Sequence, residues 1–282
     1  MTPTTDQEAF WNGASGDRWV RGQILLDALL RPYGQATREA ARIAEGDAIL
    51  DVGCGCGDTS IAIANEVGPT GRVVGLDLST PMLARARERS QGRTNITLIE
   101  GDASRAPLER GTFDLLFSRF GVMFFTDPTG AFTHLRGALR PRARVAFVCW
   151  RPLAENPWAK VPLEAAIGVL GTPEPTAPDA PGPFSFGDAA RIRSILEGAG
   201  LQRVSIRPFD TSNHFGGSGS AADAAREIVE LGPVGRLVIG RAEADLHAAI
   251  ATIEKAVTPY AKATGGVDMA AAAWVVTAEN AG

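Results

Sequence analysis

Glycines on alternate positions follow a short apolar run near residue 50. Residues 49–57 read ILDVGCGCG, so Gly53, Gly55 and Gly57 come directly after a run that ends at Asp51. A strand, a glycine-rich turn and a helix start together present backbone N–H groups and the positive end of a helix dipole. The segment therefore predicts a binding site for a polar or anionic group. A tight turn that merely requires glycine is the alternative.

Two further carboxylates stand at the ends of the next apolar runs. Asp77 ends VVGLDLS and Asp102 follows in LIEGDAS. In nucleotide-binding folds an acidic residue roughly 20 residues after the first glycine binds the ribose hydroxyls. Asp77 follows Gly53 at about this distance. Asp102 suits the amino group of an adenine, and Asp51 suits an ammonium group. The ligand indicated has an amine, a ribose and an adenine, which describes S-adenosylmethionine.

An NAD-dependent oxidoreductase is the first alternative. The dinucleotide fingerprint needs glycine or alanine at its sixth position, where this chain has Asp58 counting from Gly53. A pyrophosphate would also meet the carboxylates of Asp51 and Asp58. A protein that binds S-adenosylmethionine without transferring methyl groups is the second alternative, and the motifs do not separate it from an enzyme.

Four segments between about residues 40 and 150 resemble class I S-adenosylmethionine-dependent methyltransferases of the small-molecule type: LDVGCGCG, GLDLS, EGDA and FDLLFSRFGVMFF. The resemblance implies S-adenosylmethionine as cofactor and S-adenosylhomocysteine as product. It assigns the methionine part to Asp51, Gly53, Gly55 and Gly57, the ribose to Asp77 and Leu78, the adenine to Met82, Asp102 and Ala103, and the stretch beneath the sulfonium to Ser118.

Short apolar runs alternate with helical patterns from about residue 47, which predicts an α/β fold with a doubly wound, mostly parallel seven-stranded sheet and a helical cap. Ser79 before Pro81 and Asp127 before Pro128 indicate helix starts. The expected divisions are an N-terminal helical lid (1–40), a cofactor-binding core (41–150), an acceptor loop, helix and sixth strand (151–210), a helical cap insertion (211–264) and a final strand (265–282).

Aromatic residues gather where the acceptor pocket is expected. Trp19 in the N-terminal segment suits a lid whose ring faces the sulfonium, since aromatic faces attract cations. The proline-rich segment 171–187 is expected to cross the mouth of the site. The residues predicted to line the acceptor pocket are Trp11, Arg119, Phe120, Trp150, Trp158 and Phe184. Ordinary core packing, and solvation for the arginine, are the alternatives.

Methyl transfer from a sulfonium is an in-line displacement that chiefly needs alignment and exclusion of water. An oxygen or carbon acceptor would also need a base, and His214 is the candidate because it follows the sixth strand in a glycine-flanked loop. A merely polar loop residue is its alternative. His134 and His247 fall within helical patterns and are expected to pack or face solvent. Cys54 and Cys56 lack nearby ligands, so no metal site is expected.

Composition narrows the partners. The 28 basic and 32 acidic residues give a formal net charge of −4, with no basic stripe of the kind that binds nucleic acid. Three cysteines, no signal-like N-terminus and no long apolar run predict a cytoplasmic protein without a membrane span. The expected partner is therefore a small-molecule acceptor.

Overall fold

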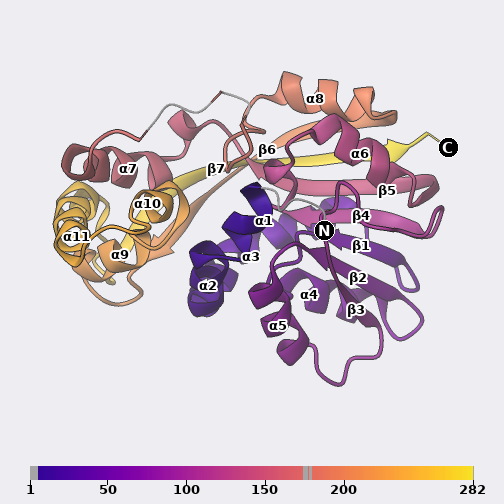
Figure 1. Ribbon diagram of the computed structural model, residues 1–282, viewed down its shortest axis with the longest axis horizontal. Helices are drawn as coiled ribbons and strands as arrows, with labels where there is room; N and C mark the ends of the chain where they lie inside the picture. The colour runs from indigo at the N-terminus through magenta and orange to yellow at the C-terminus, as the bar shows by residue number, and fades with distance from the viewer. Residues whose placement is uncertain (1–5, 174–176, 178–179, 282) are drawn as a thin grey trace.

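A seven-stranded sheet in the order β3-β2-β1-β4-β5-β7-β6 forms the centre of the structure (Figure 1). The computed structural model describes residues 6–173, 177 and 180–281. The expected proline-rich loop, 171–187, lies partly outside these described residues, as do the ends of the expected lid and of the last segment. The strands are β1 (Ala48–Val52), β2 (Arg72–Asp77), β3 (Ile96–Glu100), β4 (Phe113–Arg119), β5 (Leu139–Trp150), β6 (Leu201–Phe215) and β7 (Val267–Asn280).

Helices cover both faces of the sheet and form a separate group at one end (Figure 1). The α-helices are α1 (Asp6–Trp11), α2 (Ala14–Arg21), α3 (Gln23–Ala41), α4 (Asp58–Val67), α5 (Thr80–Arg89), α6 (Pro128–Arg136), α7 (Pro157–Leu170), α8 (Ala189–Gly198), α9 (Ala221–Ile228), α10 (Gly232–Leu237) and α11 (Glu243–Val257). Short 3-10 turns occupy Val122–Phe124, Leu153–Glu155 and Thr258–Tyr260.

Burial on both faces explains the apolar run of β1, whereas the edge strand β3 is only partly buried. Every residue of β1 is buried. Successive side chains of β1 point to opposite faces of the sheet, so Ile49 belongs to one apolar cluster and Leu50 to the other. Strands β1 to β5 pair in parallel, whereas β7 runs antiparallel between β5 and β6. The mostly parallel, doubly wound fold predicted from the alternation is thus confirmed.

Both predicted helix starts are confirmed. The Ser79 hydroxyl accepts from the Met82 amide at 3.5 Å at the start of α5. The Asp127 carboxylate accepts from the Gly130 amide at 2.9 Å at the start of α6. These contacts satisfy amides that have no partner within the first helical turn. They fix where the loops after β2 and β4 end.

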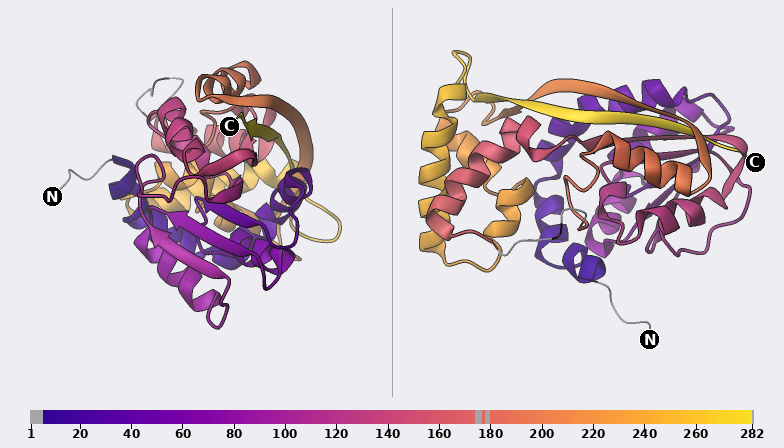
Figure 2. Two further views of the ribbon diagram at one scale, coloured as in Figure 1. Left: turned by 90° about the vertical axis from the view of Figure 1, so that its right-hand side faces the viewer. Right: turned by 90° about the horizontal axis from the view of Figure 1, so that it is seen from above.

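Strands β6 and β7 extend beyond the rest of the sheet and carry the helical group α7 and α9–α11 (Figure 2). The sequence placed the end of the sixth strand at residue 210, but β6 continues to Phe215 because its antiparallel pairing with β7 runs on to Val267. Helix α11 packs on α7 and α9 beyond this ribbon. The helical group therefore reaches the ligand side through the last residues of β6.

No helix in the part of the chain that the structure describes is long and apolar enough to cross a membrane.

Candidate functional site

A cavity of about 490 Å³ lies at the carboxyl ends of the strands, where β1 has β2 on one side and β4 on the other. In open α/β sheets this point, where the strand order reverses, is where ligands bind. Helices α1 to α3, the loops after β1 to β4, and residues from β5, β6 and α10 contribute to its walls. The cavity therefore joins the sheet, the N-terminal helices and the helical group.

The glycine loop is pressed against neighbouring backbone and side chains. Gly53 has a φ of +71°, and a Cβ there would lie 2.8 Å from the Gly121 Cα. Gly55 has a φ of +54°, and its Cβ would lie 2.9 Å from the Met82 Cε. Left-handed backbone and close approach both require glycine. Gly53 and Gly55 line the cavity, whereas Gly57 stands one step behind as the N-cap of α4.

Asp77 and Asp102 both line the cavity, at the ends of β2 and β3. The Asp77 carboxylate accepts from the Gly55 amide at 2.7 Å and from the Ser79 amide at 2.8 Å, and burial raises its pKa. Asp102 Oδ1 accepts from the Ser104 amide at 2.9 Å. Fixed carboxylates of this kind suit the hydroxyl and amino donors of a nucleoside. Leu78, Met82 and Ala103 line the cavity beside them.

Asp51 and Ser118 support the loop from below instead of lining the cavity as the sequence suggested. Asp51 is fully buried, and its Oδ2 accepts from the hydroxyls of Thr59 at 2.7 Å and Ser60 at 2.6 Å. Its Oδ1 has no partner among the described residues, and burial raises its pKa to about 6. The Ser118 hydroxyl donates to the Val52 carbonyl at 2.7 Å. Asp51 thus holds Thr59, which does line the cavity.

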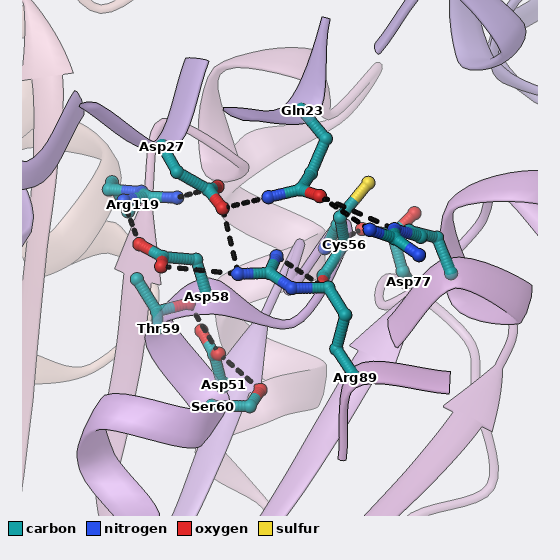
Figure 3. A network of polar contacts seen from close by, with 12 residues as sticks. Gln23, Asp27, Asp51, Cys56, Asp58, Thr59, Ser60, Asp77, Arg89 and Arg119 are labelled. Atoms are coloured by element: carbon teal, nitrogen blue, oxygen red, sulfur yellow. Dashed lines mark hydrogen bonds and ion pairs between the residues drawn. The ribbon is translucent and has the colours of Figure 1, made fainter. Parts of the chain in front are cut away.

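A network of charged side chains lies beside the glycine loop (Figure 3). Arg119 Nη1 pairs with Asp58 Oδ2 at 2.8 Å, and Arg89 Nη2 pairs with Asp27 Oδ2 at 2.8 Å. Gln23 donates to the same Asp27 carboxylate. Burial, followed by the charge of Asp58, raises the pKa of Asp27. A positively charged side chain, Arg119, and a negatively charged one, Asp27, are therefore both fixed by ion pairs at the cavity wall.

Sequence reasoning placed Arg119 with the acceptor and did not name Gln23, Asp27 or Arg89 of this network. Arg119 lines the cavity, but its ion pair with Asp58 holds it at the start of α4. Gln23 and Asp27 of α3 also line the cavity. Their spacing of four residues puts them on one side of a helix. Two polar residues on a helix face that also carries buried Leu26 and Leu30 are the signal that could have found them.

Two groups of aromatic rings also line the cavity. Phe120 stacks on Trp150, with ring centroids 4.2 Å apart, and Trp150 meets Trp158 at 4.8 Å. Trp11 contacts the rings of Trp19 at 6.0 Å and of Phe124 at 5.1 Å, and all three line the cavity. Phe184 does not line it; its neighbour Pro183 does, and Phe184 packs on the core.

Phe120 has a φ of +61°, in the left-handed region that non-glycine residues rarely adopt. Such strain persists only where the surroundings enforce it, and it clusters at ligand sites. Here the stacking of Phe120 on Trp150 holds the ring in the cavity wall. This strained residue directly after β4 forms part of the cavity wall.

His214 points away from the cavity, contrary to the sequence hypothesis of a catalytic base. Asn213 and Phe215 line the cavity, and alternation along β6 turns His214 to the other face. Its Nδ1 lies 2.6 Å from Asp268 Oδ1, and its Nε2 lies 2.8 Å from the Gly217 carbonyl. The cavity walls contain no histidine within the described ranges. The structure thus does not support His214 as the base.

The other two histidines also stand outside the walls of the cavity. His134 Nε2 lies 2.8 Å from the Ala106 carbonyl, and His247 lies on the surface beside Glu243. Within residues 6–173, 177 and 180–281 no group of three or more histidine, cysteine or acidic side chains is arranged to hold a metal ion.

The part of the cavity wall that follows β1 to β4 falls in a segment that matches a known family. Residues 49–142 match the family described as a methyltransferase domain. Demethylmenaquinone methyltransferases from strains of Staphylococcus aureus are 37% identical over 103 residues, which cover 36% of this chain and 43% of theirs. The chain therefore matches less than half the length of these curated relatives.

Two solved structures share the fold across most of the chain. One is the phosphoethanolamine N-methyltransferase 2 of Haemonchus contortus in complex with S-adenosyl-L-methionine, with a TM-score of 0.61 and 17% identity over 98% of this chain and 60% of that one. The other is the YcgJ protein of Bacillus subtilis, with a TM-score of 0.58 and 14% identity over 88% of this chain and 97% of that one. At these identities the likeness shows the fold.

Proposed function

We propose that this chain, whose residues 49–142 form a class I S-adenosylmethionine-dependent methyltransferase domain, transfers a methyl group to a small apolar acceptor. The observation that carries the proposal is a single cavity with two unlike halves. Glycine-loop amides, Asp77 and Asp102 line one part of it, and the grouped rings of Phe120, Trp150 and Trp158 line another. A cofactor with a polar nucleoside and an apolar acceptor would each meet a matching wall.

The cofactor half suits each part of S-adenosylmethionine. Arg119 and Asp27 offer opposite charges to the carboxylate and ammonium of its methionine part. Asp77 offers carboxylate oxygens to the ribose hydroxyls, and Asp102 offers them to the adenine amino group. The missing Cβ atoms of Gly53 and Gly55 let the loop pack against Gly121 and Met82, and both glycines line the cavity. Gly53, Gly55, Asp77 and Asp102, which the motifs named, thus meet Asp27, which they did not, in one cavity.

S-adenosylmethionine supplies a methyl group already activated on a sulfonium. The chain therefore has to align the acceptor and exclude water, and such alignment can supply about 7–11 kcal/mol of barrier reduction. Trp11 and Trp19 suit the exclusion of water, since both rings line the cavity from the N-terminal helices. Their π faces also favour a nearby cation.

The described cavity walls contain no histidine, lysine, glutamate or tyrosine. Their acidic side chains, Asp27, Asp77 and Asp102, stand with the cofactor half, and burial raises the pKa of the Cys54 thiol well above its usual range. A dedicated base for the acceptor is therefore absent from the aromatic half of these walls. This arrangement favours an acceptor that is nucleophilic without help from the protein.

Titration calorimetry with S-adenosylmethionine, S-adenosylhomocysteine and NAD tests the cofactor assignment. We expect micromolar or tighter binding of the first two and none of NAD. Native mass spectrometry of the freshly purified protein checks whether either ligand is retained. Binding of NAD alone would contradict the assignment.

A separate experiment distinguishes an enzyme from a protein that only binds the cofactor. The purified chain is incubated with S-adenosylmethionine and a panel of small aromatic and conjugated compounds, and release of S-adenosylhomocysteine is measured. Turnover with any acceptor supports the enzyme. Tight binding without turnover across amine, phenol, thiol and enol acceptors would favour the non-catalytic alternative.

A further inference from the structure

The wall that the later part of the chain contributes to the cavity holds a single amide side chain. We name as the acceptor wall the described lining residues beyond position 149. They are Trp150, Trp158, Pro183, Asn213, Phe215, Leu231 and Gly232. None of the seven is charged. Apart from the two indole nitrogens, the polar side-chain atoms of the acceptor wall belong to Asn213.

Asn213 is held in one orientation by a buried tyrosine. Its Oδ1 accepts a hydrogen bond of 2.9 Å from the Tyr33 hydroxyl, and Asn213 itself is only 3% exposed. Tyr33 is completely buried, and its ring contacts those of Phe120 at 5.3 Å and Trp150 at 5.0 Å. Burial raises the pKa of Tyr33, so its hydroxyl stays protonated and donates. The amide oxygen is therefore occupied from behind.

The amide nitrogen of Asn213 is left without an acceptor among the described residues. Asn213 and Phe215 alternate with His214 along β6 and share the face that lines the cavity. Asn213 Nδ2 is not among the fully buried side-chain atoms that lack a partner, so it is accessible from the cavity, where polar groups pair with water or ligand. The geometry therefore presents a fixed hydrogen-bond donor to the cavity.

We propose that Asn213 is a specificity residue whose Nδ2 donates to a neutral oxygen, such as a ketone or quinone carbonyl, on an apolar ring-bearing acceptor. The absence of charge on the acceptor wall sets the neutrality, because an unpaired ion buried there would be strongly disfavoured. Tyr33 is the positioning residue that holds the amide. The role of this contact in methyl transfer rests on the proposed function, whereas the contact itself is testable by binding alone.

Three probes with one ring system separate the possible requirements of the acceptor wall. Tetralin has no oxygen, 1-tetralone has a neutral carbonyl, and tetralin-1-carboxylate has a charge. Binding of each is measured by equilibrium dialysis in saturating S-adenosylhomocysteine. We expect 1-tetralone to bind at least about tenfold more tightly than either other probe, as expected where a site pairs its buried donor with a ligand oxygen.

Substitutions identify the donor. Asn213→Leu removes the amide and should reduce the preference for 1-tetralone over tetralin to about one, with tetralin affinity unchanged. Asn213→Asp keeps an oxygen for the Tyr33 hydroxyl but has no N–H, so it should lose the same preference. Since Asn213→Leu leaves the Tyr33 hydroxyl unpaired, the double variant Tyr33→Phe/Asn213→Leu provides the same test without that buried group. Tyr260→Phe, outside the cavity, is the matched control.

The position of Tyr33 has its own readout. Tyr33→Phe should lower the preference for 1-tetralone in part, because the amide remains but turns freely, while the affinity for tetralin stays unchanged. An unchanged preference in Tyr33→Phe would overturn the positioning role.

S-adenosylhomocysteine affinity, measured on every variant, separates this proposal from the proposed function. If the wild-type chain did not bind S-adenosylhomocysteine, the proposed methyltransferase function would be refuted. With that binding intact, equal affinity for 1-tetralone and tetralin, binding of neither, tighter binding of the carboxylate, or an undiminished preference in Asn213→Asp would each overturn the role of Asn213.

Discussion

Gly53→Ala should destabilise the fold and weaken cofactor binding together. A side chain at a left-handed position costs about 1–2 kcal/mol. The new Cβ would also lie 2.8 Å from the Gly121 Cα, which is backbone and cannot swing aside. Overpacking of this kind costs about 1–3 kcal/mol more. The free energy of unfolding should therefore fall by about 2–5 kcal/mol.

Gly92→Ala is the matched control, because Gly92 has a φ of +81° and no atom within 4 Å of the Cβ position. It should lose about 1–2 kcal/mol, from the backbone conformation alone. Urea unfolding of both variants, followed by tryptophan fluorescence and by circular dichroism, measures the two losses. Their difference isolates the close approach between the loop and Gly121.

Cofactor affinity completes this test. Moving the loop away from Gly121 displaces amides that line the cavity, so Gly53→Ala should weaken S-adenosylhomocysteine binding by more than about tenfold, or roughly 1.4 kcal/mol. Gly92→Ala should bind as the wild type does. Equal destabilisation of the two variants, or unchanged affinity in Gly53→Ala, would refute the assignment of the loop as a closely packed cofactor cradle.

Three further predictions concern charged groups. Arg119→Met should weaken the binding of S-adenosylhomocysteine by about tenfold or more, as expected for the loss of a charged hydrogen bond. The binding of 5′-methylthioadenosine, which lacks the amino-acid part, should not change. Equal losses of affinity for both ligands would contradict the assignment of Arg119 to the methionine carboxylate. His214→Asn should preserve turnover. The Asp268 carboxylate raises the pKa of His214, so their pair stabilises the fold fully below pH 6.5 and less as pH rises through the raised pKa. For this exposed pair the contribution to the free energy of unfolding should stay below about 1 kcal/mol. Thermal unfolding measured across pH should show this pH-dependent contribution in the wild type and not in His214→Asn. Arg236 lies 4.5 Å over the Phe10 ring, and Arg236→Met should speed S-adenosylhomocysteine release several-fold in stopped-flow measurements; an unchanged rate would exclude a role in closing the lid.

The cofactor half of the site was largely predictable because its chemistry is local in sequence. Gly53 and Gly55 need conformations that other residues avoid, and Asp77 and Asp102 stand at the ends of the apolar runs that form β2 and the edge strand β3. Parallel strands align their carboxyl ends at one edge of the sheet. Short motifs therefore determined the sheet class, the helix starts at Ser79 and Asp127, and which strand ends line the cavity.

The tertiary structure decided which side chains at those places reach the cavity. Asp51 stands in the glycine motif but is buried beneath it, and His214 is turned outward by the alternation of a strand longer than its sequence pattern indicated. Asp27 and Asn213 belong to none of the sequence motifs. They reach the site because α3 packs against β4 to β7 and because β6 pairs with β7 as far as Phe215, contacts between segments far apart in the chain. Local patterns specify backbone conformation, whereas the direction of a side chain into a shared cavity depends on packing that no short segment contains.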